Sequence, residues 1–170
     1  RTAHLVIDMQ TGFMTPGAPG EIAPAAEIIP NVNTISAACR NAGALNVLVQ
    51  NSISEESKQS WSNWFDAFWT ADKREGMYAT FMVGKPGHAL HPDIKVEPED
   101  MRINKFRFGA FVDGSSDLHQ RLQGRGIDTV IITGCATNIC CESTARDAMM
   151  LNYKVLFVSD ATATRITSTT

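Results

Sequence analysis

The sequence predicts an α/β fold, a three-layer α/β/α sandwich whose central sheet is mainly parallel and doubly wound. Short apolar runs rich in β-branched residues recur along the chain at positions 4–7, 45–49, 128–133 and 155–158. Near-continuous apolar runs of this length are typical of strands that are buried on both faces of a parallel sheet. Helical patterns lie between the runs, and this alternation indicates right-handed βαβ units stacked in layers.

The first predicted helix begins at Pro30, a residue that is favoured in the first turn of a helix, and ends at Gly43. Between them Val32, Ile35 and Cys39 recur at helical spacing and form one apolar stripe. The helix should therefore pack on the sheet, and we interpret Cys39 as a core residue.

A second helix is predicted to begin at Ser115, a residue type that caps helix starts. It places Leu118 and Leu122 on one face and ends at Gly124 or Gly126.

A third helix follows Thr137 and Asn138 and precedes the last strand. The helix carries, in order, Cys140, Thr144, Ala148 and Leu151.

A segment at about 58–82 interrupts the alternation of strands and helices and is rich in aromatic residues. Its aromatic residues at helical spacing are Trp61, Trp64, Phe65 and Phe68, and Trp69, Tyr78 and Phe81 follow. We interpret this segment as an inserted helix and loop. It either packs in the core or at a subunit interface, as aromatic stripes usually do, or forms a lid over a pocket.

Composition indicates one globular domain over residues 1–170, with 44% hydrophobic and 19% charged residues. The net charge is −3 and the basic residues are scattered, so we expect neither nucleic acid nor a membrane as partner. The four cysteines lack CxxC spacing, which favours a reduced, cytoplasmic setting. Because the sequence lacks an initiating Met and ends on 167–170 without a closing element, we expect the natural chain to be longer.

Three side chains that can do chemistry follow predicted strands. Asp8 comes directly after the first strand, Lys105 follows a short strand at 101–104, and Cys140 lies just past the strand at 128–133. In an open parallel sheet, ligands bind at the carboxyl ends of the strands. Taken singly, each residue has a simpler explanation, such as a turn cap, a solvated charge or a buried filler. Together they provide a base, a cation and a nucleophile at one edge.

This combination predicts covalent catalysis by a cysteine. In the first turn of a helix and beside Lys105, the pKa of the Cys140 thiol should fall from about 8.5 toward ~3.5 to 7.5. Asp8 could remove the thiol proton and return it to a departing amine. Free amide groups of the same turn could hold an oxyanion.

Three segments carry a resemblance to a known family. Residues 133–148, Thr-Gly-Cys-Ala-Thr-Asn-Ile-Cys-Cys-Glu-Ser-Thr-Ala-Arg-Asp-Ala, closely resemble the nucleophile motif of the isochorismatase-like cysteine hydrolases. Residues 5–10, Leu-Val-Ile-Asp-Met-Gln, resemble the first strand of these enzymes, and residues 104–111, Asn-Lys-Phe-Arg-Phe-Gly-Ala-Phe, resemble their lysine loop. The likeness extends in order from about residue 4 to 163.

The resemblance implies a catalytic triad that falls on Asp8, Lys105 and Cys140. It also implies a cis peptide bond between Cys135 and Ala136, with the backbone amides of Ala136 and Cys140 as the oxyanion hole. Members of the family commonly form a homodimer or a homotetramer, so we expect self-association.

Two positions depart from the usual family motif. The family usually has valine where Cys135 and Cys141 stand, so both cysteines should be small apolar substitutes.

The resemblance also narrows the chemistry. Nicotinamidases of this family bind a metal through an Asp-x-His motif, but residues 49–54 here read Val-Gln-Asn-Ser-Ile-Ser. His88 and His91 lie in a segment rich in Gly and Pro and lack a third ligand, so we predict no metal or other cofactor. True isochorismatases typically lack a cysteine at the nucleophile position, and Cys140 therefore favours cleavage of a C–N bond.

We predict a metal-independent cysteine hydrolase that cleaves an amide, ureido or carbamoyl C–N bond of a small molecule through a thioester. The loop at 105–108 looks most like that of ureidoacrylate and N-carbamoylsarcosine amidohydrolases. Arg107 could hold a substrate carboxylate or form a surface ion pair. The residues predicted to bind substrate are Phe13, Asn51, Trp61, Phe65, Arg107, Phe108, Phe111, Thr137 and Asn138.

Three alternatives stay open. One is a nicotinamidase-type amidase, and another is a binding or assembly module without catalysis, with residues 61–69 as its partner surface. The third, which we rank last, is a thiol redox protein that uses Cys140 and Cys141. Residues on successive helical positions point apart, and adjacent cysteines make a strained disulfide.

Overall fold

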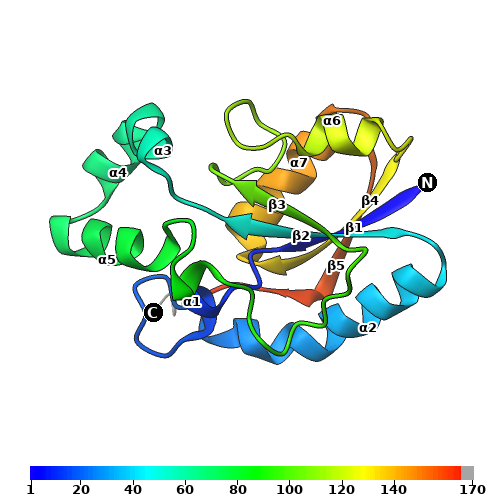
Figure 1. The fold of residues 1–170 in the computed structure, drawn as a ribbon, viewed down its shortest axis with the longest axis horizontal. Coiled ribbons are helices and arrows are strands. Elements are labelled where there is room, and N and C mark those ends of the chain that lie inside the picture. Colours follow the sequence, from blue (N-terminus) through cyan, green and yellow to red (C-terminus); the bar gives the residue numbers. More distant parts are fainter. Residues whose placement is uncertain (166–170) are drawn as a thin grey trace, which may run out of the picture.

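The computed structural model describes residues 1–165 and shows a five-stranded parallel sheet in the order β3-β2-β1-β4-β5 (Figure 1). The predicted ending at Thr167 to Thr170 lies outside the described residues. The strands are β1 (Thr2–Ile7), β2 (Leu45–Asn51), β3 (Met101–Lys105), β4 (Thr129–Cys135) and β5 (Lys154–Ala163). The predicted α/β fold with a doubly wound parallel sheet is confirmed.

The direction in which the sheet grows reverses at β1. This central strand pairs with β2 on one side and with β4 on the other, so that Ile7 aligns with Val49 and with Gly134. The sheet therefore extends from β1 to β2 on one side and to β4 on the other. In folds of this kind, ligands bind in the crevice outside the carboxyl ends of the strands at such a reversal. Asp8 follows β1 at this point of the sheet.

Helices cover both faces of the sheet. The helix α2 (Ile29–Asn41) packs on one face, where its Val32 joins a buried cluster with Val6 and Leu48 of the sheet. On the other face lie α6 (Leu118–Gln123) and α7 (Glu142–Met150), whose buried residues join a second cluster with alternate strand residues. Successive strand residues point to opposite faces, so near-continuous apolar strands serve both clusters.

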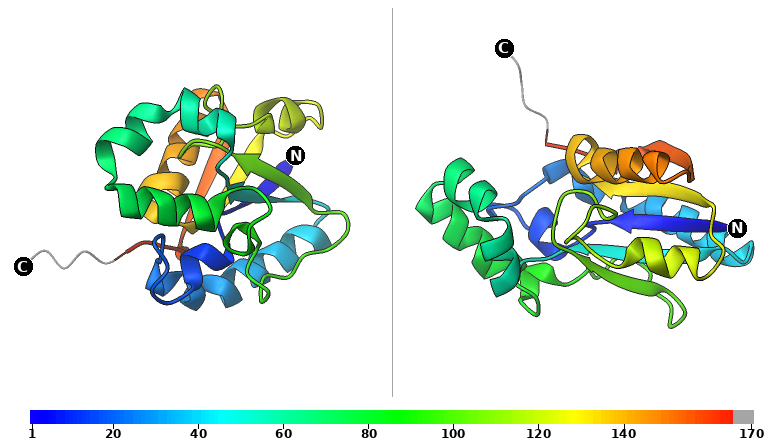
Figure 2. Two further views of the ribbon diagram at one scale, coloured as in Figure 1. Left: turned by 60° about the vertical axis from the view of Figure 1, so that its left-hand side comes forward. Right: turned by 90° about the horizontal axis from the view of Figure 1, so that it is seen from above.

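The aromatic segment forms three helices that stand beyond the carboxyl ends of the strands (Figures 1 and 2). They are α3 (Glu55–Ser60), α4 (Ser62–Phe68) and α5 (Ala71–Phe81). Ser54 and Ser57 form a reciprocal capping box at the start of α3, and the Thr70 side chain caps α5. We refer to residues 55–81 as the aromatic insert.

Short helical turns complete the chain. They are α1 (Thr11–Met14), η1 (Ala23–Ile28), η2 (Pro86–His88) and η3 (Thr137–Cys141). None of the helices within residues 1–165 is long and apolar enough to cross a membrane.

Several predicted boundaries differ from the structure. The helix predicted from Ser115 begins at Leu118, because the Ser115 hydroxyl donates to the Gly109 carbonyl at 2.6 Å instead of capping a helix. The last strand continues beyond Val158 to Ala163. The predicted third helix is a π-helical turn followed by α7, and Leu151 lies just after its last residue.

Candidate active site

Asp8 occupies a backbone conformation that suits few residue types. Its φ is 54°, in the left-handed region that non-glycine residues rarely adopt, and its N–H donates to the Val49 carbonyl at 2.8 Å. On the neighbouring strand, a Cβ at Gly134 would lie 1.9 Å from the Ile7 carbonyl oxygen. Only glycine therefore lets β4 approach β1 so closely beside Asp8.

Lys105 is the last residue of β3, and its side chain is fully buried beneath the crevice. Its Nζ lies 2.9 Å from the Asp8 Oδ2 and 3.4 Å from the Cys140 Sγ. It also donates to the Arg107 carbonyl at 3.2 Å and to the Asn51 Oδ1 at 3.4 Å. The structure thus brings the three predicted side chains together, and we call them the Asp8–Lys105–Cys140 cluster.

Cys140 lies in the turn η3, which follows β4. The turn opens after a cis peptide bond between Cys135 and Ala136. The Ala136 carbonyl accepts hydrogen bonds from the N–H groups of Ile139, at 3.2 Å, and Cys141, at 3.1 Å. The second of these bonds spans five residues, as in a π-helix, a wide form of turn that is frequent at functional sites.

Burial dominates the electrostatics of the cluster. It raises the pKa of the Cys140 thiol to about 12, although the Lys105 ammonium pulls in the opposite direction. Burial also raises the pKa of the Asp8 carboxyl, again against Lys105. For Lys105, burial lowers the pKa, but the Asp8 carboxylate and the Cys140 sulfur outweigh it and the pKa rises.

The prediction of a lowered thiol pKa is therefore wrong. Sequence position placed Cys140 at a helix start beside a cation but gave no measure of how completely the sulfur would be removed from water. The Cys140 side chain is 7% exposed, and desolvation of a thiolate outweighs one nearby ammonium that is itself paired with Asp8. The resting form of Cys140 near neutral pH is the thiol.

The Asp8 carboxylate has an ion pair but, within residues 1–165, neither oxygen receives a well-directed hydrogen bond. Both oxygens are closed to solvent. Burial raises the pKa of this carboxyl, and the Lys105 charge together with weaker hydrogen bonds from Cys140 and the Asn51 backbone only partly opposes it. The raised pKa leaves the carboxylate ready to accept a proton.

The other two cysteines near the cluster point away from it. The Cys135 Sγ contacts the Asp8 backbone carbonyl at 3.2 Å, and the Cys141 Sγ contacts the Thr133 carbonyl at 3.9 Å. Burial raises the pKa of both thiols well above the usual range. All four cysteines are free, so Cys140 and Cys141 form no disulfide in the structure.

A cavity of about 380 Å³ opens beside Cys140, between the sheet edge and the aromatic insert. Six of the residues predicted to bind substrate line it, namely Phe13, Asn51, Trp61, Phe65, Phe108 and Asn138. Trp64 and Trp69, which belong to the aromatic segment interpreted above as a possible lid, line it too. Sequence reasoning missed others, among them Ile22, Ser52, Lys73, Met77, Phe106, Thr164 and Arg165. No sequence signal singled out Lys73 or Arg165, since they come from segments that meet only in the folded chain.

The aromatic insert combines both interpretations of its sequence. Phe65 is buried in the core cluster and also lines the cavity. Trp61 meets Phe108 edge to face, with ring centroids 4.9 Å apart, and so joins the insert to the loop after β3. Phe68, in contrast, is 72% exposed.

Three residues predicted to bind substrate do not line the cavity. Within residues 1–165, Arg107 forms no ion pair with an Asp or Glu side chain, and its guanidinium turns toward the aromatic insert. Its guanidinium donates to the Phe106 carbonyl at 2.8 Å and the Ser60 hydroxyl at 3.1 Å and lies 5.3 Å from the Trp61 ring centroid. These contacts fasten the aromatic insert to the loop that contains Arg107.

Phe111 is the second residue outside the cavity. It packs against Tyr153 on the other face of the sheet, with ring centroids 5.4 Å apart. Thr137, the third, precedes the cavity-lining Asn138 without lining the cavity itself.

The residues at the position of the family's metal site do not fit a zinc ion. Residues 49–54, at the end of β2 and just after it, read Val-Gln-Asn-Ser-Ile-Ser and contain neither Asp nor His. The Nε2 of His88 lies 2.8 Å from the Ser52 hydroxyl, in a buried polar network. Over the part of the chain that the structure describes, no group of three or more His, Cys, Asp or Glu side chains is placed to hold a metal.

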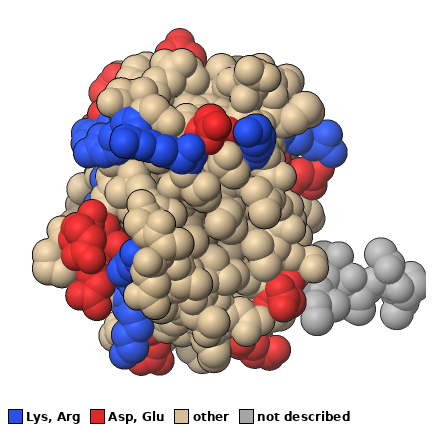
Figure 3. All heavy atoms as spheres, turned by 90° about the vertical axis from the view of Figure 1, so that its right-hand side faces the viewer, with Lys and Arg blue, Asp and Glu red and all other residues tan. Residues whose placement is uncertain are grey.

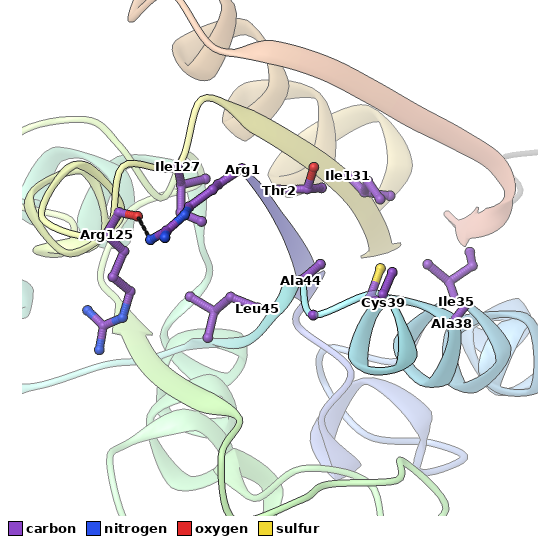
Figure 4. Close-up of a pocket in the computed structure, with 12 residues that line it drawn as sticks. Arg1, Thr2, Ile35, Ala38, Cys39, Ala44, Leu45, Arg125, Ile127 and Ile131 are labelled. Carbon is purple, nitrogen blue, oxygen red and sulfur yellow. Dashed lines mark hydrogen bonds between the residues drawn. The ribbon is translucent and has the colours of Figure 1, made fainter.

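A second cavity, of about 880 Å³, lies at the amino ends of the strands (Figure 4). Arg1 donates to the Arg125 carbonyl at 3.2 Å at its rim, and Cys39 contributes a thiol to its wall. Figure 3 shows the corresponding side of the molecule, where a band of Lys and Arg crosses a largely uncharged surface. This cavity is distant from the Asp8–Lys105–Cys140 cluster, which lies at the opposite ends of the strands.

Comparisons with known proteins identify the family of the chain. The isochorismatase domain matches residues 2–169. The ureidoacrylate amidohydrolase RutB of Caulobacter vibrioides is 32% identical over 95% of this chain and 76% of that protein. The enzyme of the same name from Variovorax paradoxus is 34% identical over 95% of this chain and 68% of its own length.

Solved structures of related proteins share this fold. An isochorismatase family protein from Desulfovibrio vulgaris superposes with a TM-score of 0.80 at 25% identity, over 97% of this chain and 83% of that chain. The predicted family is confirmed, and the chain belongs to the isochorismatase family of hydrolases.

Proposed function

We propose that the chain is a metal-independent cysteine hydrolase that cleaves the C–N bond of a small amide, ureido or carbamoyl compound. One observation carries the proposal. A thiol, an ammonium and a carboxylate lie in contact at the carboxyl edge of the sheet, with Lys105 Nζ 3.4 Å from Cys140 Sγ and 2.9 Å from Asp8 Oδ2. Of the three, Cys140 lines the cavity.

In the first half of the reaction, Asp8 accepts the thiol proton as the Cys140 sulfur attacks the substrate carbonyl. The raised pKa of the Asp8 carboxyl supports this role, because it makes the carboxylate a stronger base. The backbone N–H groups of Ala136 and Cys140 would hold the resulting oxyanion. The C–N bond then breaks, and the departing amine or ammonia takes its proton from Asp8.

The second half releases the acid. Asp8 removes a proton from water, which attacks the sulfur-bound carbonyl, and the C–S bond breaks. The proton returns from Asp8 to the Cys140 sulfur, so that both groups end as they began.

Lys105 contributes charge and orientation rather than a proton. Its raised pKa keeps it an ammonium throughout. When the thiol proton moves to Asp8, the ammonium faces the new thiolate at a distance of 3.4 Å, so the cluster keeps one anion beside one cation.

The relatives support the substrate class. Relatives that are 32% and 34% identical are named ureidoacrylate amidohydrolases. In this chain, the cluster could supply the nucleophile, the base and the cation for cleavage of such a C–N bond. Residues 49–54 lack the Asp-x-His ligands of the family's metal-binding members, and within residues 1–165 no group of three His, Cys, Asp or Glu side chains could hold a metal. Both observations support a reaction without a metal.

Ammonia release from a panel of ureido acids, carbamoyl amino acids, nicotinamide and simple amides tests the proposal. We expect release from at least one ureido or carbamoyl compound, unaffected by chelator and abolished by Cys140→Ala. Cys39→Ala is the matched control, because Cys39 is equally exposed but lies in the other cavity. Activity that survives Cys140→Ala would end the proposal.

A binding or assembly module is the second candidate, and the raised pKa of Cys140 is the observation that favours it. A chain that binds members of the panel in the cavity without releasing ammonia would support this alternative.

A further inference from the structure

We propose that the substrate carries a carboxylate in addition to its scissile C–N bond, and that Lys73 and Arg165 bind this carboxylate at the mouth of the cavity. The inference rests on the proposed function and extends it to the part of the substrate that does not react. It assigns a role to two residues that the chemistry at Cys140 leaves unused.

The charges that line the cavity are the first observation. Lys73 and Arg165 are its cationic lining residues, and no Asp or Glu within residues 1–165 lines it. Both cations are exposed, whereas Cys140, which lines the same cavity, is buried. Between them the wall is mainly aromatic and apolar. The cavity thus has a reactive sulfur at its inner side and two positive charges at its solvent side.

The position of Lys73 follows from the packing of α5. Lys73 lies in the first turn of this helix, and its backbone N–H donates to the capping Thr70 hydroxyl. One turn later Met77 also lines the cavity, as expected for residues four apart on one helix face. Gly76 packs so closely on Pro19 that a Cβ would lie 2.8 Å from its ring. This contact holds α5 against the loop of Pro19 and Gly20, which also line the cavity.

Arg165 is held against the same loop. Its Nε and Nη2 donate to the Glu21 backbone carbonyl at 3.1 and 2.6 Å. The preceding Thr164 hydroxyl donates to the Asn138 Oδ1 at 2.6 Å, which ties this segment to the turn that contains Cys140. Because a carbonyl is neutral, these bonds orient the guanidinium without cancelling its charge.

An anionic substituent is the chemical complement of this mouth. Hydrogen bonds between an ammonium or guanidinium and a carboxylate are about twice as strong as neutral ones. A cavity of about 380 Å³ suits a small molecule, so the carboxylate and the scissile carbonyl would belong to one compact acid. A bound acid would place its scissile carbonyl at the buried Cys140 sulfur and its carboxylate at the exposed cations. Lys105 would not compete for the carboxylate, because it is already paired with Asp8.

Matched substrates test the inference. Each ureido acid, such as N-carbamoylglycine or N-carbamoyl-β-alanine, is compared with the ureido alcohol in which CH2OH replaces the carboxylate. We expect the wild-type chain to prefer the acid in kcat/KM. Lys73→Met and Arg165→Gln should each lower kcat/KM for the acid by about 10-fold or more, with little change for the alcohol.

The control variants separate charge from structure. Lys73→Arg and Arg165→Lys should restore most of the preference for the acid, because they keep the charge. Lys85→Met removes one positive charge from an exposed residue outside the cavity and should behave as wild type. Equal turnover of acid and alcohol by the wild type, or equal losses for both in the Lys73 and Arg165 variants, would overturn the inference.

Binding measurements keep this result distinct from the proposed function. In Cys140→Ala, calorimetry should show tighter binding of the acid than of the alcohol, and Lys73→Met in that background should remove the difference. A binding preference in Cys140→Ala together with no turnover by the wild-type chain would support the carboxylate site and contradict the hydrolase. Turnover without any preference in binding would support the hydrolase and contradict the carboxylate site.

Discussion

Lys105 and Asp8 form an ion pair of 2.9 Å in which neither side chain is exposed to solvent. They come from the ends of β3 and β1, two strands that β2 separates. The ion pair therefore links the carboxyl ends of β1 and β3 beside Cys140. Its burial has consequences for stability as well as for chemistry.

Removal of the ammonium should destabilise the fold. Lys105→Met leaves the Asp8 carboxylate buried without its partner, and such a loss costs about 3 to 5 kcal/mol. Lys58→Met is the matched control, because Lys58 pairs with a largely exposed Glu55 at 2.8 Å and such pairs contribute about 0 to 1 kcal/mol. Urea unfolding measures both, and equal losses would contradict a stabilising role for the buried pair.

Stability should fall in alkaline solution because of Cys140. The folded-state pKa of its thiol is about 12, above its ordinary value of about 8.5, so the folded state binds the proton more tightly than the unfolded state. Its contribution is complete below about pH 8.5 and is lost as the pH rises toward 12, with a slope of about 1.4 kcal/mol per pH unit. Cys140→Ser should lessen the slope of the unfolding free energy between pH 9 and 10 by an amount of this order. An unchanged slope would place the thiol pKa near its ordinary value.

Alkylation should distinguish Cys140 from Cys39, although both are 7% exposed and each lines a cavity. With Asp8 as base, iodoacetamide at neutral pH should label Cys140 faster than Cys39 by about 100-fold or more, the usual range for general-base assistance. Asp8→Asn should remove this advantage. Equal labelling of the two thiols in the wild-type chain, read by peptide mass spectrometry, would favour the binding module.

Arg107 should act on the aromatic insert and not on substrate charge. Arg107→Lys keeps the charge but loses the planar contacts with Ser60 and Trp61, and we expect a loss of about 1 kcal/mol in unfolding free energy. The preference for ureido acids over ureido alcohols should be unchanged. A large loss of that preference in Arg107→Lys, with Lys73→Met behaving as wild type, would return the carboxylate contact to Arg107.

The sequence predicted which residues lie at the ends of the strands, but it did not predict properties that depend on burial. The positions of Asp8, Lys105 and Cys140 could be predicted, because the carboxyl ends of parallel strands share one edge. The direction of the Cys140 pKa shift could not be predicted, since it depends on how many atoms surround the sulfur. Helix position favours the thiolate, and only the folded structure shows that desolvation is larger.

The cavity wall shows a second limit. The aromatic spacing identified Trp61 and Phe65, because helical periodicity is visible in the chain itself. Lys73 and Arg165 are single charges from segments far apart in sequence, and nothing local distinguishes them from solvated surface residues. Arg107 illustrates the converse, because its place next to Lys105 suggested a substrate contact, whereas its guanidinium turns toward Ser60.

A trapped covalent intermediate would identify the nucleophile. The chain is mixed with a ureido or carbamoyl substrate that it turns over, quenched in acid during turnover, digested and analysed by mass spectrometry. We predict that the peptide containing Cys140 gains the mass of the substrate's acyl or carbamoyl group, that hydroxylamine removes it, and that Cys140→Ala shows neither adduct nor turnover. Turnover with the adduct on another residue, or undiminished turnover in Cys140→Ala, would contradict nucleophilic attack by Cys140.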